Sequence, residues 1–585
     1  MLVIAGCTGD LSKKKIFPAI NKVFRRRLSE CTGGAYAETE LNQTDGTLSS
    51  STSAHNLSKY SPITIANPED PVNTKKYVEA TASRILHRKM KQGDILKNNG
   101  IIIPRIMGYA RSQLSTVDFI RRIDPSIVYL KETVEKIEYH SGEYDKIIDK
   151  VYEQLEMNYK EEKVLDSELY IYLAVPPEIY PTILGEVRER LQRISVQESE
   201  EKGPSDVVPT VLIEKPVGTS LETFLELKEP LQNNPDRFLC IDHYLFKNVI
   251  VRYKEIYNAS VLKDMVVPGY VKEVKGYFNE VIGVEGREGY YNTSGACRDV
   301  LQNHLLLSVA TVLAGNGSRM EILKKIEPLK PENTLFGVYA EYADVIRKSG
   351  EVPSTLRRSL SETSINREFV KQRSADKEDA QEPVLDPSIK ETFIKTETEI
   401  SEPWSIPLKM TAGKRMPAHF VAVILILTDE AILKLVKAET HPADYENTKL
   451  TEKIEKMLGS KEERTEKSAP YAAAEQGIET EESQEETVSP AEKKTQRKNI
   501  TGKIKVKITP KESISIEIKY KNKLAKKVNI PIPNTEDNID AYEHLFNQLI
   551  FQKEVHGFSS LAEIESQWRI VDPILDHPEV TRILY

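Results

Sequence analysis

Apolar and polar positions follow two different patterns along this chain. Strands alternate with helices in the first part, and strands follow without regular helices between them in the second. Residues 1–5 form an unbroken apolar run, which is typical of a strand buried on both faces of a parallel sheet. A helical pattern follows at once, because Ile16, Ile20 and Val23 recur at steps of four and three. The chain is therefore predicted to begin with a strand, a turn and a helix.

The same alternation of strands and helices returns after residue 100. Apolar runs predict strands at residues 101–109, 169–175, 208–214 and 238–241. Helical patterns predict helices from Ser115, around 144–157, at 178–191 and after Ser220. Strands that alternate with helices form parallel sheets with helices on both faces. The first part of the chain is therefore predicted to be a doubly wound, Rossmann-like α/β domain that ends with the strand at 238–241.

A different pattern of strands and helices follows Asp242. Strands are predicted at 271–280, 420–428, 503–508 and 513–519, without regular helices between them. Residues 299–313 read as a strong amphipathic helix, and two more helices are predicted at about 538–552 and 560–569. This arrangement predicts an α+β domain built on a large antiparallel sheet, with helices on one face.

Three segments fit neither of these two patterns. Ser, Thr, Asn and Gly dominate much of residues 29–100, where one helix is predicted near 75–91. Residues 354–386 and 452–498 are rich in Glu, Lys, Ser and Thr, and such composition favours solvated linkers over packed structure, although charged segments can also recruit partners. The predicted domains are 1–242, with its insertion at 29–100, and 243–585, with the two charged insertions.

Composition narrows the class of protein. A chain of 585 residues with 39% hydrophobic and 29% charged residues predicts two or more globular domains. The net charge of −8 argues against nucleic acid as the main partner. The four cysteines are scattered, which argues against a structural zinc site or a disulfide framework and fits a reducing compartment. Without an apolar stretch long enough to span a membrane, and with a strand at the very start, the expected location is the cytoplasm.

A glycine-containing turn joins the first strand to the first helix. Its residues are Gly6, Cys7, Thr8, Gly9, Asp10 and Leu11. Gly6 permits a sharp turn and Gly9 lets the backbone approach a pyrophosphate, which then faces the helix N-terminus. An ordinary glycine turn has the same letters, so this pattern alone is a weak indication of a dinucleotide-binding loop.

A cluster of chemically active side chains follows the strand at 238–241. Asp242, His243, Tyr244 and Lys247 lie within six residues. Ligands bind outside the carboxyl ends of strands in open α/β sheets, and a four-residue spacing puts His243 and Lys247 on one face of a helix, where both cations can hold a phosphate. The alternative is a surface turn with a solvated lysine and a core histidine, and these residues alone leave both interpretations open.

The motifs occur in an order that resembles the glucose-6-phosphate dehydrogenases. The similar stretches are residues 6–15, 108–112, 172–177, 214–218, 242–247, 285–287, 298–304, 540–543 and 568–570. Each is short, but the collinear set covers almost the whole chain outside the three insertions. The resemblance implies NADP-dependent oxidation of glucose 6-phosphate at C1 to 6-phosphogluconolactone, the first step of the oxidative pentose phosphate pathway, by a homodimer or homotetramer.

The resemblance also implies roles for individual residues at the reaction centre. His304 matches the general base, and Asp242 matches the carboxylate that orients it. Periodicity alone would make His304 an ordinary helix histidine. The remaining substrate residues implied by the resemblance are His243, Tyr244 and Lys247 for the phosphate, Glu280 and Asp299 for sugar hydroxyls, Lys215 between substrate and coenzyme, and Lys414, whose alternative is a loop lysine.

The coenzyme residues are implied in the same way. They are Gly6, Thr8, Gly9, Asp10, Leu11, Lys15, Arg111, Tyr172 and Lys215. Thr8 and Arg111 match groups around the adenosine 2′-phosphate, and an arginine there favours NADP over NAD because its planar group pairs with phosphate. Tyr172 matches a further coenzyme contact, with core packing as the alternative.

Some positions depart from the family's pattern. His419 stands where an arginine is usual, and Thr509 stands where a glutamine is expected near the sugar. Glu517 replaces a basic residue of a second, structural NADP site, and the usual aromatic C-terminal tail is not found, so a single NADP per chain is expected. Two alternatives follow: a sugar dehydrogenase with altered substrate or coenzyme preference, and a catalytically silent nucleotide-binding interaction protein.

Overall fold

A computed structural model gives the structure of two compact units. The described residues are 1–31, 103–123, 134–163, 165–196, 203–348, 388–437, 448–459, 499–533, 539–553, 555 and 557–585. The first unit comprises Met1–Glu214 with Tyr542–Val555, and the second comprises Lys215–Ala541 with His556–Tyr585. This division by contacts falls at Glu214, whereas the predicted domain boundary lies at residue 242.

The first unit contains the predicted parallel sheet. Its strands are β1 (Leu2–Ala5), β2 (Ile106–Ala110), β3 (Ile137–Ser141), β4 (Leu169–Leu173) and β5 (Pro209–Glu214). They pair in parallel in the order β3-β2-β1-β4-β5, so β1 lies centrally, as its unbroken burial requires. Strand β3 was not predicted, because its residues alternate between buried and half-buried positions instead of forming an apolar run.

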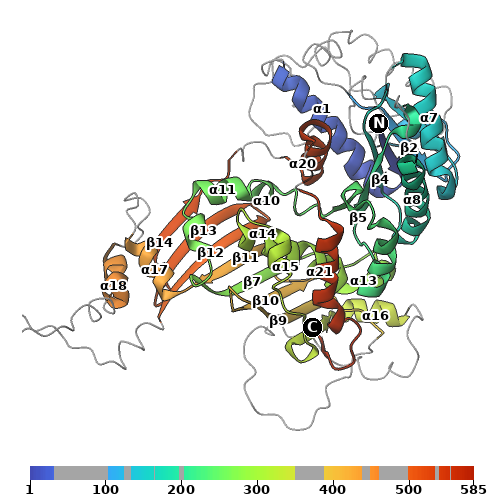
Figure 1. Ribbon diagram of the computed structural model, residues 1–585. Coiled ribbons are helices and arrows are strands. Elements are labelled where there is room, and N and C mark those ends of the chain that lie inside the picture. Colours follow the sequence, from blue (N-terminus) through green and yellow to red (C-terminus); the bar gives the residue numbers. More distant parts are fainter. Residues whose placement is uncertain are drawn as a thin grey trace, which may run out of the picture. The chain divides into compact units, whose positions relative to one another are not determined.

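Helices cover both faces of this sheet. They are η1 (Ser12–Ile16), α1 (Phe17–Cys31), α5 (Thr116–Arg122), α7 (Ile147–Glu162) and α8 (Tyr180–Val196). Figure 1 shows α1 on one side of the strands and α7 and α8 on the other, as in a doubly wound fold. Ser115 caps α5 as predicted, since its side chain accepts a hydrogen bond from the Asp118 amide.

A segment from late in the chain packs with the first unit. Helix α20 (Ala541–Asn547) continues into η12 (Gln548–Gln552), which confirms a helix predicted at 538–552. Phe551 packs edge-on against Phe24 of α1, and the Tyr542 hydroxyl donates to Glu214 at 3.2 Å. The predicted domains assigned this segment to the second half of the chain, whereas its contacts place Tyr542–Val555 in the first unit.

The second unit is built on a nine-stranded sheet. The strands are β7 (Val271–Asn279), β8 (Thr334–Val338), β9 (Phe393–Ile400), β10 (Ile406–Gly413), β11 (Phe420–Leu427), β12 (Ile500–Thr509), β13 (Ser513–Tyr520), β14 (Lys523–Ile530) and β15 (Thr581–Leu584), in the order β14-β13-β12-β11-β7-β10-β9-β8-β15. Most neighbours are antiparallel as predicted, but β7 with β10 and β8 with β15 are parallel. The sheet is therefore mixed, which corrects the prediction of an antiparallel sheet.

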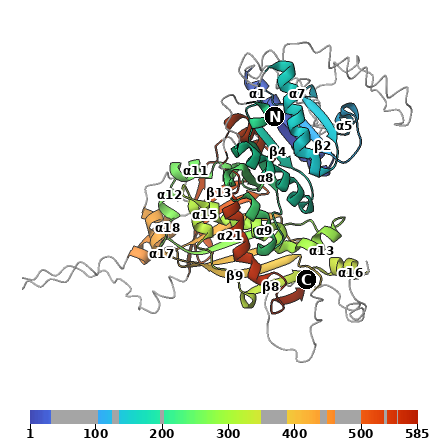
Figure 2. The ribbon, with the colours of Figure 1, turned by 45° about the vertical axis from the view of Figure 1, so that its right-hand side comes forward.

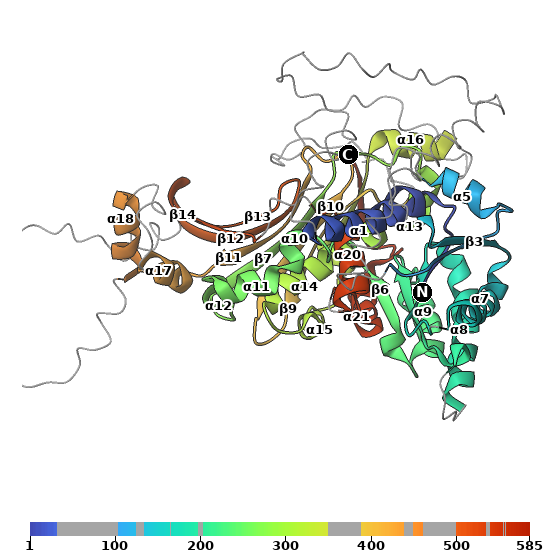
Figure 3. The same ribbon diagram turned by 90° about the horizontal axis from the view of Figure 1, so that it is seen from above.

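Helices pack on one face of the large sheet, which Figure 3 shows edge-on. The main ones are α11 (Tyr253–Ala259), α12 (Leu262–Met265), η7 (Cys297–Leu305), α14 (Leu306–Ala314) and α15 (Arg319–Leu323). The predicted helix at 299–313 is present as η7 and α14, although η7 is a π-helix. Gly276 of β7 allows the close approach of this helix pair, because a Cβ there would lie 3.0 Å from Leu305.

Other helices complete the second unit. They are α9 (Leu221–Lys228), α10 (Asn248–Val251), α13 (Glu288–Ala296), α16 (Ala340–Lys348), α17 (Asp429–Lys437), α18 (Thr448–Gly459) and α21 (Leu561–Val571). Helix α21 confirms the one predicted at 560–569 and lies beside α9 and α15 (Figure 2). No helix among the described residues is long and apolar enough to cross a membrane.

Most of the three predicted insertions lies outside the described residues, including the helix predicted at 75–91. Residues 29–31 belong to the end of α1, and 452–459 belong to α18, which contacts α17. Ile454 of α18 is fully buried. The predicted linker therefore starts too early, because its first residues form an amphipathic helix that packs on the sheet domain.

Candidate active site

A carboxylate and an imidazole form a buried pair in the second unit. Strand β6 (Phe238–Ile241) is buried at every position and ends directly before Asp242, which is 3% exposed. A turn follows, in which the Leu245 amide donates to the Asp242 carbonyl. Asp242 Oδ1 accepts the Tyr244 amide at 2.9 Å and lies 2.7 Å from Nδ1 of His304. The sequence predicted this pair only through the family resemblance.

His304 is held within the helix η7 and is 2% exposed. Its ring lies 4.5 Å from Tyr244, 4.6 Å from His243 and 5.7 Å from Phe278, measured between ring centroids. Burial, and then the positive charge of Lys215, hold the pKa of His304 well below its usual value. Because an ionised Asp242 can only accept hydrogen bonds, Nδ1 is assigned the proton and Nε2 is the basic nitrogen.

Two lysines and two carboxylates form a second group close to this pair. Lys215 Nζ donates to the Asp299 carbonyl at 2.7 Å and lies 3.4 Å from Asp299 Oδ1. Lys414 Nζ lies 3.4 Å from Asp299 Oδ2 and donates to Glu280 at 2.5 Å. Burial raises the pKa of Asp299, but Lys215 and Lys414 together lower it well below its usual range. Asp299 is therefore held ionised between two cations.

The parallel pairing of β7 and β10 places Glu280 beside Lys414. Both residues follow the carboxyl ends of these adjacent strands, where Asn279 pairs with Gly413. The Glu280 amide donates to the Gly413 carbonyl at 2.9 Å. Lys414 lies in a bend after β10 but is only 9% exposed, so it is a buried, ion-paired lysine and not a solvated one. Burial lowers the pKa of Lys215, but Asp299, Tyr290 and Asp242 together outweigh this effect and the net shift is upward.

The predicted phosphate residues lie on the turn that links β6 to α10. Tyr244 is buried, and His243 and Lys247 are half-buried. Lys247 Nζ lies 5.8 Å from the Tyr244 ring centroid. One charged neighbour was not predicted from the sequence: Glu512, after β12, accepts the Val249 amide at 2.6 Å. Burial raises the pKa of Glu512 and the charge of Lys247 opposes this, so a carboxylate lies near the predicted phosphate lysine.

The two residues that depart from the family pattern contact one another. His419 Nε2 and Thr509 Oγ1 are 2.6 Å apart. His419 precedes β11 and Thr509 ends β12, and these strands are paired in an antiparallel manner. The two departures therefore form one changed contact on the sheet rather than two independent changes.

The glycine turn of the first unit forms a tight backbone cradle. Gly6 has a φ of +79°, and a Cβ there would lie 2.3 Å from the Ala174 carbonyl oxygen. The Gly6 amide donates to Tyr109, and the Ser12 hydroxyl donates to the Gly6 carbonyl. Thr8 and Leu11 are half-buried, while Gly9, Asp10 and Lys15 are exposed. The exposed part of the turn thus follows the carboxyl end of the central strand β1, where dinucleotides bind in this fold.

The two other predicted coenzyme residues differ in exposure. Arg111 directly follows β2 and is exposed, with its guanidinium 5.9 Å from the Tyr144 ring. Tyr172 is fully buried, and its hydroxyl donates to Glu214 at 2.5 Å. Burial raises the pKa of Tyr172, which therefore stays a neutral core residue. Core packing, the alternative for Tyr172, agrees better with this geometry than a coenzyme contact.

Two family models match consecutive parts of the chain. The glucose-6-phosphate dehydrogenase NAD-binding domain matches residues 86–251, and the glucose-6-phosphate dehydrogenase C-terminal domain matches 256–459. The chain belongs to the glucose-6-phosphate dehydrogenase family. The glycine turn of this family member precedes the matched residues, so its assignment rests on the fold and the motif.

Individual relatives agree with this membership. The chain is 30% identical over 285 residues to glucose-6-phosphate 1-dehydrogenase of Kluyveromyces lactis, covering 43% of this chain and 52% of that protein. It is 29% identical over 335 residues to the enzyme of Hanseniaspora uvarum, covering 51% of this chain and 60% of that protein. The chain thus spans about half the length of the curated relatives it matches.

A solved structure of the family has the same fold. It is a glucose-6-phosphate dehydrogenase in complex with its substrate glucose 6-phosphate, with a TM-score of 0.58 and 20% identity. The superposition covers 100% of this chain and 94% of that one. The predicted combination of a parallel sheet domain and an α+β domain is confirmed in this family member.

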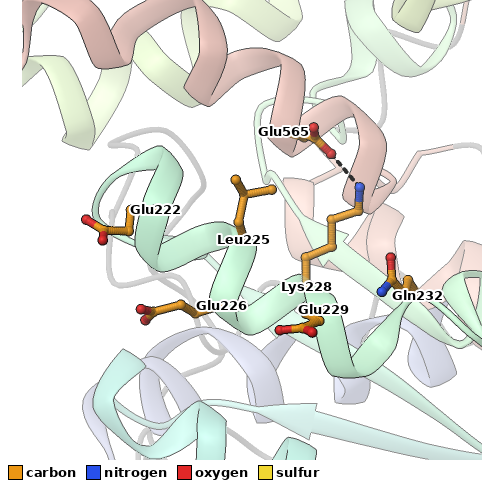
Figure 4. A pocket seen from close by; sticks show the side chains of 7 residues that line it. All are labelled: Glu222, Leu225, Glu226, Lys228, Glu229, Gln232 and Glu565. Carbon is orange, nitrogen blue, oxygen red and sulfur yellow. Dashed lines mark hydrogen bonds and ion pairs between the residues drawn. The ribbon is translucent and has the colours of Figure 1, made fainter.

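One surface hollow among the described residues has the wrong charge for a sugar phosphate. It has a volume of about 410 Å³ and is lined by Glu222, Leu225, Glu226, Lys228, Glu229, Gln232 and Glu565 (Figure 4). Its lysine is paired with Glu565, as the dashed line in Figure 4 marks. None of the predicted site residues lines this hollow, and its carboxylates would repel a phosphate.

The sheet face near Glu517 does not carry the negative charge that the sequence argument assumed. Glu517 pairs with Lys503 at 3.2 Å across β12 and β13. Lys505, Lys507 and Lys519 lie on the same face by strand register. Burial raises the pKa of Glu517, but Lys503 and nearby lysines lower it overall. Repulsion by Glu517 is therefore no reason to exclude an anion from this face.

Proposed function

We propose that this family member oxidises glucose 6-phosphate at C1 to 6-phosphogluconolactone, with hydride transfer to NADP, the first step of the oxidative pentose phosphate pathway. The observation that carries the proposal is the 2.7 Å contact between Asp242 and His304, close to the Lys215–Asp299–Lys414–Glu280 cluster. A base oriented by a carboxylate is what removal of the C1 hydroxyl proton requires.

In the proposed reaction His304 accepts the proton of the C1 hydroxyl through Nε2. A base must be neutral before it accepts a proton, and burial together with Lys215 favours the neutral imidazole by lowering the pKa of His304. Asp242 then stabilises the imidazolium through Nδ1, without taking the proton itself. Loss of the hydroxyl proton lets the oxygen form the lactone carbonyl as hydride leaves C1.

The surrounding residues are proposed to hold the sugar. Asp299 and Glu280 are acceptors for sugar hydroxyl groups, since Lys215 and Lys414 keep Asp299 ionised. His243, Tyr244 and Lys247 bind the phosphate, and Lys247 contributes the charge-assisted hydrogen bond. This arrangement fixes C1 relative to His304 by contacts at the opposite end of the sugar.

The fold and the glycine cradle fit NADP in the first unit. Gly6, Thr8, Gly9, Asp10, Leu11 and Lys15 form the loop proposed to receive the pyrophosphate, and Arg111 is exposed where the adenosine 2′-phosphate is expected. Gly6 is buried with a positive φ, and a Cβ there would lie 2.3 Å from the Ala174 carbonyl oxygen, so glycine permits the tight turn that leads to the exposed Gly9 and Asp10. When bound, NADP supplies the acceptor for the hydride from C1. In this proposal residues 1–242 bind coenzyme and end with Asp242, Lys215 lies between coenzyme and substrate, and 243–585 hold the remaining substrate residues.

We also propose a cytoplasmic homodimer or homotetramer, on the strength of the family alone. Sedimentation at several protein concentrations measures the state of assembly. A monomer at every concentration contradicts the proposed assembly and leaves the proposed reaction intact.

The contact between His419 and Thr509 favours one second candidate function, a dehydrogenase with altered substrate or coenzyme preference. A histidine and a threonine in contact replace the arginine and the glutamine of the family pattern. Comparing kcat/KM for glucose 6-phosphate and other sugar phosphates, each with NADP and with NAD, separates the two functions. The proposed function requires glucose 6-phosphate with NADP to give the highest value.

The deciding experiment is an assay of NADPH formation with purified protein and glucose 6-phosphate. We expect reduction that depends on both reactants and that His304→Asn abolishes nearly completely. A folded protein that binds NADP but reduces none with any sugar phosphate would instead support the catalytically silent alternative.

A further inference from the structure

One oxygen of the Asp242 carboxylate has no hydrogen-bond partner among the described residues. Oδ1 accepts the Tyr244 amide and the His304 ring, whereas Oδ2 is buried and unpaired. An ionised oxygen without a partner in a protein interior is costly, and buried polar atoms usually bind protein or an ordered water. The orphaned oxygen belongs to the carboxylate that orients the proposed base.

A small enclosed cavity lies against Asp242. Its volume is about 10 Å³, and its walls come from β6, η7 and the segment before α21. Cys240, Ile241 and Asp242 form one wall, and Gln302 and Ser559 contribute polar groups from the others. This volume is about the smallest that holds a single water molecule.

Ser559 provides a second unpaired group in the lining of this cavity. Its Oγ is buried without a partner among the described residues, and the residue is 1% exposed. Backbone hydrogen bonds fix its position, since Ser559 and Cys240 exchange amide-to-carbonyl bonds of 2.9 and 3.0 Å. Ser560 then caps α21 in a capping box with Glu563. The hydroxyl is therefore held rigidly beside the strand that ends at Asp242.

We propose that this cavity binds one water molecule that donates to Asp242 Oδ2 and hydrogen-bonds Ser559 Oγ, which makes Ser559 a positioning residue for the Asp242–His304 pair. Water suits the site because it can satisfy an acceptor and a hydroxyl at once. Its effect on turnover rests on the proposed function, whereas its binding does not.

The charged groups around the pair act on Asp242 by their charge, but none of those described donates a hydrogen bond to Oδ2. Burial raises the pKa of Asp242, and His243, Lys215 and Arg319 oppose the shift. Lys215 donates to Asp299, and Arg319 of α15 pairs with Glu563 at 3.0 Å. Lys414 and Lys247 act electrostatically on His304 from β10 and from the turn before α10, with Asp299 opposing them from η7.

Loss of the water is expected to disturb the orientation of the base. Without a donor at Oδ2, negative charge concentrates on Oδ1 of Asp242, which then accepts more strongly from His304 and favours the imidazolium. Because the carboxylate is also held less firmly, we expect kcat in Ser559→Ala to fall about tenfold, the loss expected for one hydrogen bond to a charged group, with little change in KM. The acid limb of the pH profile should move to higher pH, because the pKa of His304 rises.

The matched variants separate positioning from general damage. Ser559→Thr keeps a hydroxyl and should recover most of the activity. Ser566→Ala, which removes a half-buried hydroxyl that contacts the Ala562 carbonyl and Met320 away from the cavity, should match wild type. Ser559→Ala with the kcat and pH profile of wild type overturns the positioning role.

Two measurements do not need catalysis, so they separate failure of this inference from failure of the proposed function. A high-resolution crystal structure of the wild-type protein should contain a water peak within hydrogen-bond distance of Asp242 Oδ2 and Ser559 Oγ. NMR titration of the histidines, assigned with His304→Asn, should give a higher pKa for His304 in Ser559→Ala than in wild type. An empty cavity in the crystal, or an unchanged titration in that variant, contradicts the inference whatever the activity.

Discussion

The two units contain the proposed site residues in contrasting environments. In the second unit Asp242, His304 and Asp299 are buried and already bonded to one another or to lysines. In the first unit the exposed Gly9 and Arg111 offer a backbone turn and a cation at strand ends. The substrate cluster is thus organised before any ligand binds, while the coenzyme residues lie open to the ligand.

This difference follows from the chemistry assigned to each unit. A base works only if its neighbours fix its protonation and orientation in advance, which burial and fixed charges provide. A dinucleotide needs a close backbone approach and a charge for its phosphates, which glycine and arginine supply without burial. Substitutions in the second unit should therefore change turnover, and those in the first should change coenzyme binding.

The largest expected effect is that of His304→Asn. We expect kcat to fall by at least about 10²-fold, the low end for a lost general base, with substrate binding retained. In the wild type the rate should fall when pH drops far enough to protonate His304, at a pH below the usual histidine range. Steady-state kinetics across pH check both points.

A suitable control is His577→Asn, which removes a histidine outside the cluster and should leave kcat unchanged. Near-normal turnover in His304→Asn would remove the contrast between a pre-organised substrate site and an open coenzyme site.

Lys247→Ala should have the next largest effect. Glucose 6-phosphate should lose about 10- to 100-fold in kcat/KM, because one charge-assisted hydrogen bond to its phosphate is lost. Free glucose at high concentration should react as it does with wild type. The control Lys254→Ala removes an exposed lysine of α11. Equal losses for both sugars would make Lys247 structural.

Arg111→Ala tests the exposed coenzyme site of the first unit. The KM for NADP should rise about tenfold while the KM for NAD changes little, because only NADP carries the 2′-phosphate. Arg121→Ala removes an exposed arginine of α5 paired with Asp118 and provides the control. If the variant keeps wild-type selectivity for NADP, another residue binds the 2′-phosphate.

The buried histidine should also make stability depend on pH. The folded-state pKa of His304 lies below its unfolded value of about 6.5, so its contribution is present above that pH and is lost as pH falls through the folded pKa. Urea unfolding at pH 8 and pH 5.5 should show a larger drop for wild type than for His304→Asn. Equal drops would mean that His304 titrates normally in the folded chain.

The smallest effect is expected from shortening the charged segment. Because α18 extends to Gly459, the deletion should span residues 461–497, with a short Gly-Ser linker. Activity and melting temperature should stay nearly unchanged, since the cost of loop closure varies slowly with length. A large loss would show that the segment stabilises one of the units.

The sequence predicted individual helices and strands better than it predicted the contacts between them. The strand before Asp242 and the helix around His304 follow from apolar runs and helical periodicity, but their contact joins residues far apart in the chain. Lys414 meets Glu280 because β10 lies parallel to β7, and local patterns do not specify a neighbour across such distances. Glu512 was missed for the same reason: it reaches α10 from a sheet hairpin.

Two strands, β9 and β10, were not predicted although their residues alternate as strand residues do. Strands β9 and β10 alternate buried and more exposed residues, as half-buried strands do. They follow a charged segment, Lys and Glu occupy the exposed positions of β9, and Thr occupies two of its buried positions, so few apolar residues mark this strand. Tyr172 shows the opposite error, because a motif suggested coenzyme contact where a fully buried strand position favours packing.

The transfer of hydride from C1 is the central claim, and it can be followed with glucose 6-phosphate deuterated at C1. The account predicts that each lactone formed leaves one deuterium on the reduced coenzyme, measured by mass spectrometry, and that turnover depends on His304. Reduced coenzyme without deuterium, or no reduction by a folded protein that binds both ligands, would contradict it.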